Sequence, residues 1–244
     1  MEMRDGFIIS VFNYCDRWCD TCSLSSYCRV FVAMTGDEAS SEINMAALVG
    51  AAPHDGPPAP PKWLEDVFEE LNSLAGRPFT HEELLAGEPT MAAAHQEIYE
   101  RAKAYCVWVH DVGHRQYDRH RDPTDPRAVI SWFSSLTAST IRRALTGLAD
   151  FDGNREVPPD HEGAAKVALL GIDRSYAAWQ QLVTDHGLSA VRARPCLEAL
   201  AWLRTRLEAA IPDARAFVRP GFDEPEAVAR LRAAAASRPP ERAW

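Results

Sequence analysis

The chain has 244 residues, and its 26 basic and 35 acidic side chains give a formal net charge of −9. Hydrophobic residues make up 46% of the chain and charged residues 25%, values that are typical of a globular protein and exclude disorder of the whole chain. No apolar run approaches the roughly 20 residues that a membrane span needs. An acidic chain also lacks the basic surface that nucleic-acid binding requires. We therefore expect neither a membrane nor a nucleic acid among its partners.

The N-terminal residues predict a short β-hairpin. Residues 7–12 are rich in β-branched and aromatic side chains, which is typical of a strand, and Val30 to Val32 are the expected return strand. The apolar run is too short for the core of a signal peptide and no small-residue cleavage site follows it, so we expect a cytoplasmic protein. In that reducing compartment, clustered cysteines are more often metal ligands than disulfides.

Beyond a proline-rich stretch, the apolar residues recur with a helical period. A short helix is predicted at 63–74 and a capping box at Thr80 to Glu83. Apolar stripes at steps of three and four predict four longer helices and a final short one, at 91–122, 126–148, 162–186, 195–211 and 226–236.

These elements predict an all-α fold, an antiparallel helical bundle preceded by a small Cys-rich metal knuckle with a short β-hairpin. The predicted division of the chain is a knuckle at 1–34, a proline-rich connector at 35–62 and a helical bundle domain at 63–244. Pro126 and Gly187 are well placed to begin the second long helix and to end the third.

Four of the six cysteines form a compact cluster, Cys15-x3-Cys19-x2-Cys22-x5-Cys28. Four thiolates satisfy either a tetrahedral zinc ion or a [4Fe–4S] cluster. Zinc sites usually have two matched C-x2-C arms and only Cys19 and Cys22 have that spacing, whereas iron–sulfur sites often take several ligands from one irregular loop. The spacing therefore favours a [4Fe–4S] cluster, with zinc as the open alternative. The other two cysteines, Cys106 and Cys196, lie on or beside apolar stripes and are predicted core residues.

The cysteine spacing resembles that of two known kinds of cluster site. Cys15-x3-Cys19-x2-Cys22 resembles the radical-SAM signature, although the helical remainder lacks the βα units of that family and Thr21 stands where an aromatic residue is usual. Cys19-x2-Cys22-x5-Cys28 is similar to loops that hold auxiliary [4Fe–4S] clusters in several enzyme families. This second resemblance implies the same cofactor for three of the four thiols.

A longer resemblance covers most of the chain. Residues 12–19 with the following cysteines, residues 163–175 and residues 219–223 resemble an uncharacterised bacterial family that has a Cys-rich N-terminal motif followed by a helical domain. That resemblance transfers no activity. It implies that the cysteine segment and the helices form one unit.

A second candidate site is the sequence His110-Asp111-Val112-Gly113-His114. It resembles the His-Asp core of HD-domain metalloproteins, which are all-helical and carry out phosphoester hydrolysis or, with two irons, oxygen chemistry. The resemblance implies catalytic roles for His110, Asp111 and His114. The remaining ligands would be an upstream histidine and a downstream aspartate, for which the candidates are His81, His95, Asp152, Asp160 and Asp173. The competing interpretation is a polar helix end, because this face borders the apolar stripe.

Two further polar residues are expected to be partly buried in the bundle. Lys166 and Asp173 lie beside apolar positions, and a buried carboxylate requires a partner, which Arg142 or Arg143 is expected to supply. The tryptophans that fall one per long helix are predicted to fill the core, namely Trp108, Trp132, Trp179 and Trp202.

The sequence thus predicts a metalloprotein that binds a [4Fe–4S] cluster or zinc through its four N-terminal cysteines. The expected role is that of an iron–sulfur or other metal-dependent oxidoreductase or biosynthetic enzyme, with a small-molecule substrate or a protein partner. Two alternatives stay open. One is an HD-like metal-dependent hydrolase or oxygenase centred on His110 and Asp111, and the other is a zinc-stabilised interaction module without catalysis.

Overall fold

The computed structural model describes residues 2–4, 6–35, 91–113, 122–153 and 159–236. One compact unit consists of Met1–Phe31 and Thr90–Trp244, and Val32–Pro89 form a second. The predicted connector, the helix at 63–74, the capping box and His81 lie outside the described residues. Apart from residues 32–35, the described residues belong to the first unit.

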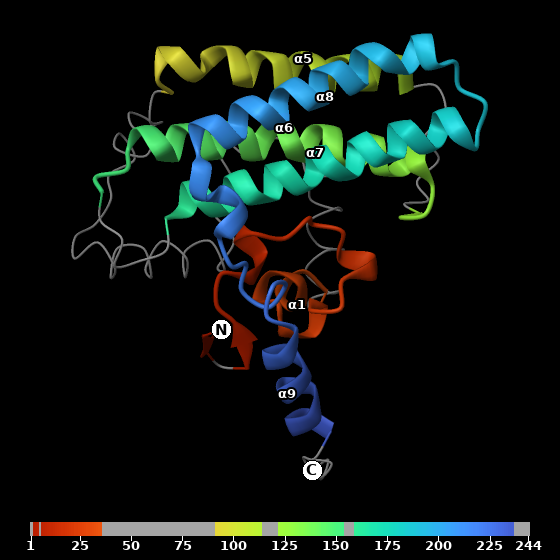
Figure 1. Ribbon diagram of the computed structural model, residues 1–244. Helices are drawn as coiled ribbons and strands as arrows, with labels where there is room; N and C mark the ends of the chain where they lie inside the picture. Colours follow the sequence, from red (N-terminus) through yellow and green to blue (C-terminus); the bar gives the residue numbers. More distant parts are fainter. Residues whose placement is uncertain (1, 5, 36–90, 114–121, 154–158, 237–244) are drawn as a thin grey trace, which may run out of the picture. The chain divides into compact units, whose positions relative to one another are not determined.

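Four long helices form the body of this unit: α5 (Gln96–Gly113), α6 (Pro126–Ala149), α7 (Asp160–Thr184) and α8 (Ala190–Ala210). They run alternately in opposite directions (Figure 1). α6 lies against α7 over most of its length, α5 packs on α6, α8 packs on α7, and α5 meets α8. The mainly helical fold predicted from the sequence is confirmed.

The predicted apolar stripes face a common core between these helices. Each helix contributes residues at helical spacing, and burying them supplies most of the stability of such a bundle. The buried stripe residues are Ile98, Ala102, Tyr105, Val109, Ile130, Ile141, Ala144, Ala165, Ala168, Ile172, Trp179, Cys196, Leu200, Leu203 and Leu207.

Local sequence explains most of the helix ends. Pro126 is the first residue of α6, and the Asp125 side chain caps the helix by accepting a hydrogen bond from Arg127 N at 2.9 Å. Beyond α7, Gly187 adopts φ +69°.

The predicted starts of the first and fourth long helices differ from the observed ones. α5 begins at Gln96, after a 3-10 turn at Ala93–His95, whereas its predicted end near 122 is not tested because residues 114–121 lie outside the described part of the chain. α8 begins five residues before Pro195, the predicted start. Pro195 is accommodated because the carbonyl that its missing N–H leaves unbonded belongs to Val191, a residue that is 80% exposed to water.

The N-terminal hairpin exists but pairs different residues from those predicted. Strand β1 (Met3–Arg4) pairs antiparallel with β2 (Phe7–Ile8), and Asp5-Gly6 lies between them. Asp-Gly is a preferred two-residue hairpin turn because its glycine adopts positive φ, here +85°. The predicted return strand at Val30 to Val32 was wrong, since these residues belong to helix α1 (Arg29–Thr35).

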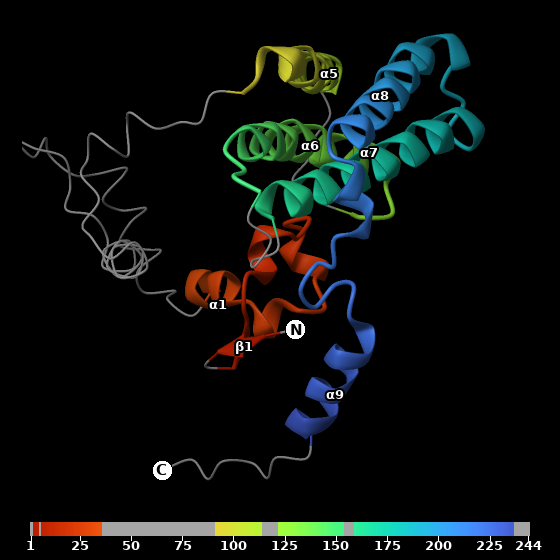
Figure 2. The ribbon, with the colours of Figure 1, turned by 60° about the vertical axis from the view of Figure 1, so that its left-hand side comes forward.

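The N-terminal segment lies beside α6 and α7, on the side away from α5 and α8 (Figures 1 and 2). Its packing uses two further apolar clusters. One consists of Tyr14, Trp18, Phe133, Leu136, Val167 and Phe217, and the other of Ile8, Val11, Leu24 and Val228. The C-terminal part of the chain therefore also packs on this segment, through the residues that follow the 3-10 helix η5 (Pro212–Ala216) and through α9 (Pro225–Ala236). Within the described ranges, no helix combines the length and the apolar character that crossing a membrane requires.

Candidate metal centre

All four N-terminal cysteines line one pocket. We call residues 15–28 the cysteine loop. It contains two single-turn 3-10 helices, Cys19–Thr21 and Ser25–Tyr27, and all four of its cysteines line the pocket. Most of the other lining side chains are apolar, and they come from both ends of the unit: Val11, Phe12, Trp18, Leu24, Phe31 and Phe222.

Two of the sulfurs accept backbone hydrogen bonds in the same local pattern. The N–H of Leu24 lies 3.4 Å from the Cys22 sulfur, and the N–H of Arg17 donates to the Cys15 sulfur. In both cases the donor is two residues beyond the cysteine. Arg17 adopts φ +57°, a conformation that is uncommon for residues other than glycine. Backbone N–H groups directed at sulfur stabilise thiolates and are among the interactions that tune iron–sulfur centres.

The thiols of the loop also interact electrostatically. Burial raises the pKa of the Cys15 thiol to about 11, and the nearby Asp16, Cys19 and Cys28 add to this effect. Burial likewise raises the pKa of Cys19, with Cys22 and Cys28 contributing. The metal-free Cys15 thiol is therefore protonated at neutral pH, and it donates to the carbonyl oxygen of Phe12 at 3.4 Å. A bound cation reverses this preference, because it stabilises the thiolates and offsets their mutual repulsion.

The bundle holds the start of the cysteine loop at Asp16. Its carboxylate accepts a hydrogen bond from Arg174 of α7 at 2.6 Å, and its carbonyl oxygen accepts one from Trp132 Nε1 of α6 at 2.8 Å. The other carboxylate oxygen accepts the N–H of Trp18 at 3.2 Å. The residue that follows Cys15 is therefore fixed at three atoms.

The residues just before Cys15 are held by the same two helices. Tyr14 donates its hydroxyl to Asp160 of α7 at 3.0 Å, and Arg143 of α6 pairs with that aspartate. Arg143 also donates to the carbonyl oxygen of Asn13 at 2.9 Å. Burial, followed by the charge of Asp160, raises the pKa of Tyr14, so the tyrosine stays a neutral donor. Cys15 thus lies between two segments that are both attached to α6 and α7.

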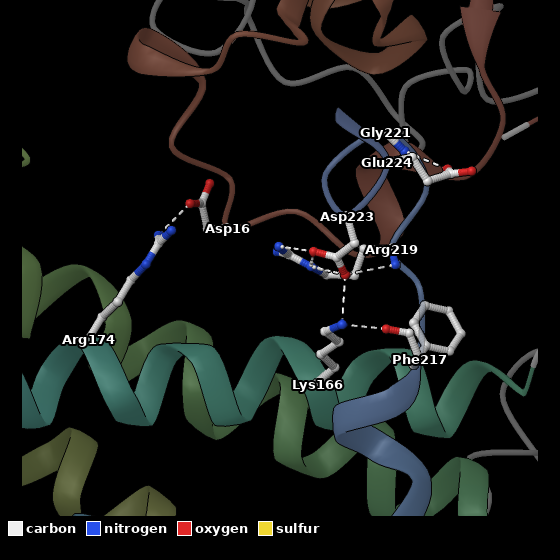
Figure 3. A network of polar contacts seen from close by, with 8 residues as sticks. All are labelled: Asp16, Lys166, Arg174, Phe217, Arg219, Gly221, Asp223 and Glu224. Carbon is white, nitrogen blue, oxygen red and sulfur yellow. Dashed lines mark hydrogen bonds and ion pairs between the residues drawn. The ribbon is translucent and has the colours of Figure 1, made fainter. Parts of the chain in front are cut away.

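A second polar network holds the C-terminal wall of the pocket (Figure 3). Lys166 of α7 pairs with Asp223 at 2.7 Å and also donates to the carbonyl oxygen of Phe217. Arg219 pairs with the same carboxylate at 2.9 Å. Burial opposes ionisation of Asp223, but hydrogen bonds from Arg219 and Lys166 outweigh it and hold the pKa well below its usual range. Phe222, which lines the pocket, lies between these paired residues in the sequence.

The chemistry of this donor set fits a metal group. Trp18 is 5% exposed and lines the pocket, and its indole N–H is buried without a hydrogen-bond partner among the described residues. A buried N–H of this kind normally has an acceptor, and sulfur atoms in the pocket would supply one. In the described part of the chain, no three His, Cys, Asp or Glu side chains are already arranged to hold a metal ion. Coordination by the four cysteines therefore requires their side chains to converge when the group binds.

Of the three HD-like residues, the structure describes the side chain of His110 alone. His110 Nε2 lies 2.8 Å from the hydroxyl of Ser135 on α6, while His114 lies outside the described residues, as do the side-chain contacts of Asp111. The candidate ligand His95 is at the opposite end of the same helical run, roughly 20 Å away at 1.5 Å per residue.

Two of the candidate aspartates have arginine partners. Asp160 pairs with Arg143, and Asp173 pairs with Arg204 at 3.0 Å and Arg215 at 2.7 Å. The expectation that Arg142 or Arg143 partners Asp173 was wrong, because the carboxylate is directed toward α8 and η5. The HD-like site stays a prediction.

The remaining cysteines and tryptophans divide between core and surface. Cys196 is buried, and burial raises the pKa of its thiol to about 12, as expected for a core thiol. Cys106 is only half-buried and contacts the hydroxyl of Ser135. Trp179 is buried, whereas Trp108 is 39% exposed, so the prediction that every long helix places its tryptophan in the core was wrong for Trp108.

Asp16 and Arg174, which hold the cysteine loop, are not among the site residues predicted from the sequence. The Asp-x-Trp order at 16–18 is a usable signal for the local part, since aspartate side chains commonly accept the N–H two residues on. Comparison with known proteins adds no relative, because no family model, no curated protein and no solved structure matches this chain.

Proposed function

We propose that the protein is a metalloprotein whose metal centre is held by Cys15, Cys19, Cys22 and Cys28. The observation that carries this proposal is that all four cysteines line one largely apolar pocket, with backbone N–H groups already donating to two of the sulfurs. Thiolates are soft ligands that suit zinc and iron–sulfur clusters. Neither of the remaining cysteines, at 106 and 196, lines this pocket.

Of the two metal groups, zinc and an iron–sulfur cluster, we propose a [4Fe–4S] cluster. Its support is the irregular spacing within a single loop and the apolar lining, which limits access of water to a redox centre. Such a group supplies one-electron transfer, which would suit a redox or biosynthetic enzyme. The chain's own residues would bind it, exclude water from it and donate hydrogen bonds to the cysteine sulfurs that hold it.

The test is metal analysis of the full chain purified without oxygen, both as isolated and after reconstitution with iron and sulfide. The expected result is about four iron and four sulfide atoms per chain and a brown colour. Each of Cys15→Ser, Cys19→Ser, Cys22→Ser and Cys28→Ser should lose most of the iron.

The matched control is Cys106→Ser, because that thiol lies outside the pocket and already contacts a hydroxyl. A colourless protein with one tightly held zinc would refute the cluster and keep the four-cysteine centre. Retention of neither iron nor zinc would refute the centre itself.

A further inference from the structure

We infer that Asp16, Trp132 and Arg174 are positioning residues that hold the Cys15 sulfur in place for metal binding. This inference rests on the proposed metal centre and says which part of the fold sets its geometry. None of the three side chains is itself proposed as a ligand. They act through the backbone of the cysteine loop, which α6 and α7 hold at the residue next to Cys15.

The local geometry shows how fixing Asp16 fixes the sulfur. Asp16 accepts the N–H of Trp18 through one carboxylate oxygen, which closes a tight turn around Arg17. Within that turn Arg17 has φ +57° and its N–H donates to the Cys15 sulfur. A left-handed conformation is unfavourable for a non-glycine residue and persists only when surrounding contacts determine it. The two contacts from the bundle to Asp16 are of this kind.

Both bundle side chains are themselves held by aromatic packing. The guanidinium of Arg174 lies over the ring of Phe133, 5.1 Å from its centre, and the Trp132 ring lies 5.6 Å from that of Trp18. Figure 3 shows Arg174 extending from α7 to the carboxylate of Asp16. A side chain that packs against an aromatic ring restricts its partner more closely than a freely rotating one does. Helices of the bundle thus determine where the first cysteine of the loop lies.

The test compares variants that remove one contact each. Trp132→Phe removes the N–H that bonds to the Asp16 carbonyl oxygen and leaves every charge in place. Arg174→Gln removes the ion pair, and Arg174→Lys restores the charge. The full chain and its variants are loaded in parallel with Zn²⁺ and with iron and sulfide. We then measure the apparent affinity for Zn²⁺ by chelator competition, the rate at which a chelator removes iron, and the absorption spectrum of the loaded forms.

Both Trp132→Phe and Arg174→Gln should bind the metal group about 10- to 100-fold more weakly than the wild type, as is typical when a residue behind a ligand is lost. Arg174→Lys should recover part of the loss. Matched controls are Trp108→Phe, a partly exposed tryptophan of α5, and Arg194→Gln, which breaks an exposed pair with Glu198, and both should bind like the wild type.

Unchanged binding in both test variants overturns the inference, as does an equal loss in the controls. Weakening by Arg174→Gln alone also overturns it, because charge rather than position would then be the cause. A wild type that holds neither zinc nor iron refutes the metal centre instead. Thermal unfolding of the metal-free variants tests whether the bundle is intact. Arg174→Gln should unfold like the wild type, because Arg174 is about half exposed.

Discussion

Replacing Asp223 by asparagine should destabilise the protein by about 3 kcal/mol. The side chains of Lys166, Asp223 and Arg219 are 16%, 24% and 14% exposed, so the network is mostly shielded from water. Asparagine keeps the shape of the side chain but leaves two largely buried cations without a carboxylate. Breaking a buried pair in this way costs about 3–5 kcal/mol, and the remaining exposure places the expected value at the lower end.

The assay is urea unfolding of the metal-free protein followed by circular dichroism. The midpoint should fall without a change in slope, and the melting temperature should fall by roughly 6–12 °C, at 2–4 °C per kcal/mol for a chain of this size. Glu198→Gln is the control, since the Arg194–Glu198 pair is 76% and 67% exposed and should contribute less than about 1 kcal/mol. A loss below about 1 kcal/mol in Asp223→Asn would refute the reasoning.

The same network predicts a dependence on pH. The pKa of Asp223 is lowered in the folded protein, so its contribution to stability is fully present above the unfolded pKa of about 3.9 and is lost as the pH falls from there toward the folded pKa. The difference in stability between wild type and Asp223→Asn should therefore be constant from about pH 7 to 5 and shrink below about pH 4. A difference that persists undiminished at pH 2 would show that the carboxylate charge is not its source.

Three further substitutions test buried contacts. Gly163→Ala should destabilise the protein by about 1–2 kcal/mol in urea unfolding, although alanine favours helices. The reason is that the added Cβ would lie 2.6 Å from Tyr14 Cδ1 and 2.8 Å from Phe217 Cζ. A more stable variant would contradict this. Thr137→Val should leave stability unchanged or raise it by up to about 1 kcal/mol, since the Thr137 hydroxyl is buried without a partner among the described residues. Thr140→Val should instead lose about 1 kcal/mol, because that hydroxyl donates to the Leu136 carbonyl oxygen at 2.7 Å, and equal effects of the two changes would refute the distinction.

The helical fold was predictable because its signals are local. The apolar period, the capping Asp125 with Pro126, and Gly187 each act within a few residues, and all three lie where the structure needs them. Asp5-Gly6 was an equally local signal for the hairpin, but the predicted return strand at Val30 to Val32 drew on β propensity, which packing overrides easily. Pro195 shows that a proline does not always mark the start of a helix, because an exposed first turn tolerates the missing hydrogen bond.

The candidate site was predictable only as a set of ligands. The cysteine spacing identifies four residues that the structure brings to one pocket. What surrounds them depends on how helices rotate against one another, which the apolar period does not specify closely. Asp173 of α7 illustrates this. The apolar period does not show whether its carboxylate faces Arg142 on α6 or Arg204 on α8. Likewise, nothing near Cys15 in the sequence indicates that Trp132 or Arg174 contacts the next residue.

The distance along the chain between the cysteine loop and its contacts has a consequence for folding during synthesis. The hydrogen bonds that hold Tyr14 and Asp16 join residues 116, 146 and 158 positions apart. At roughly 5–20 residues per second, a ribosome needs about 8–30 s after Asp16 before it reaches Arg174. Contacts between such distant residues also form later than local ones. The thiols are therefore accessible to a metal donor, or to an oxidant, for seconds before α7 is available to hold the cysteine loop in place.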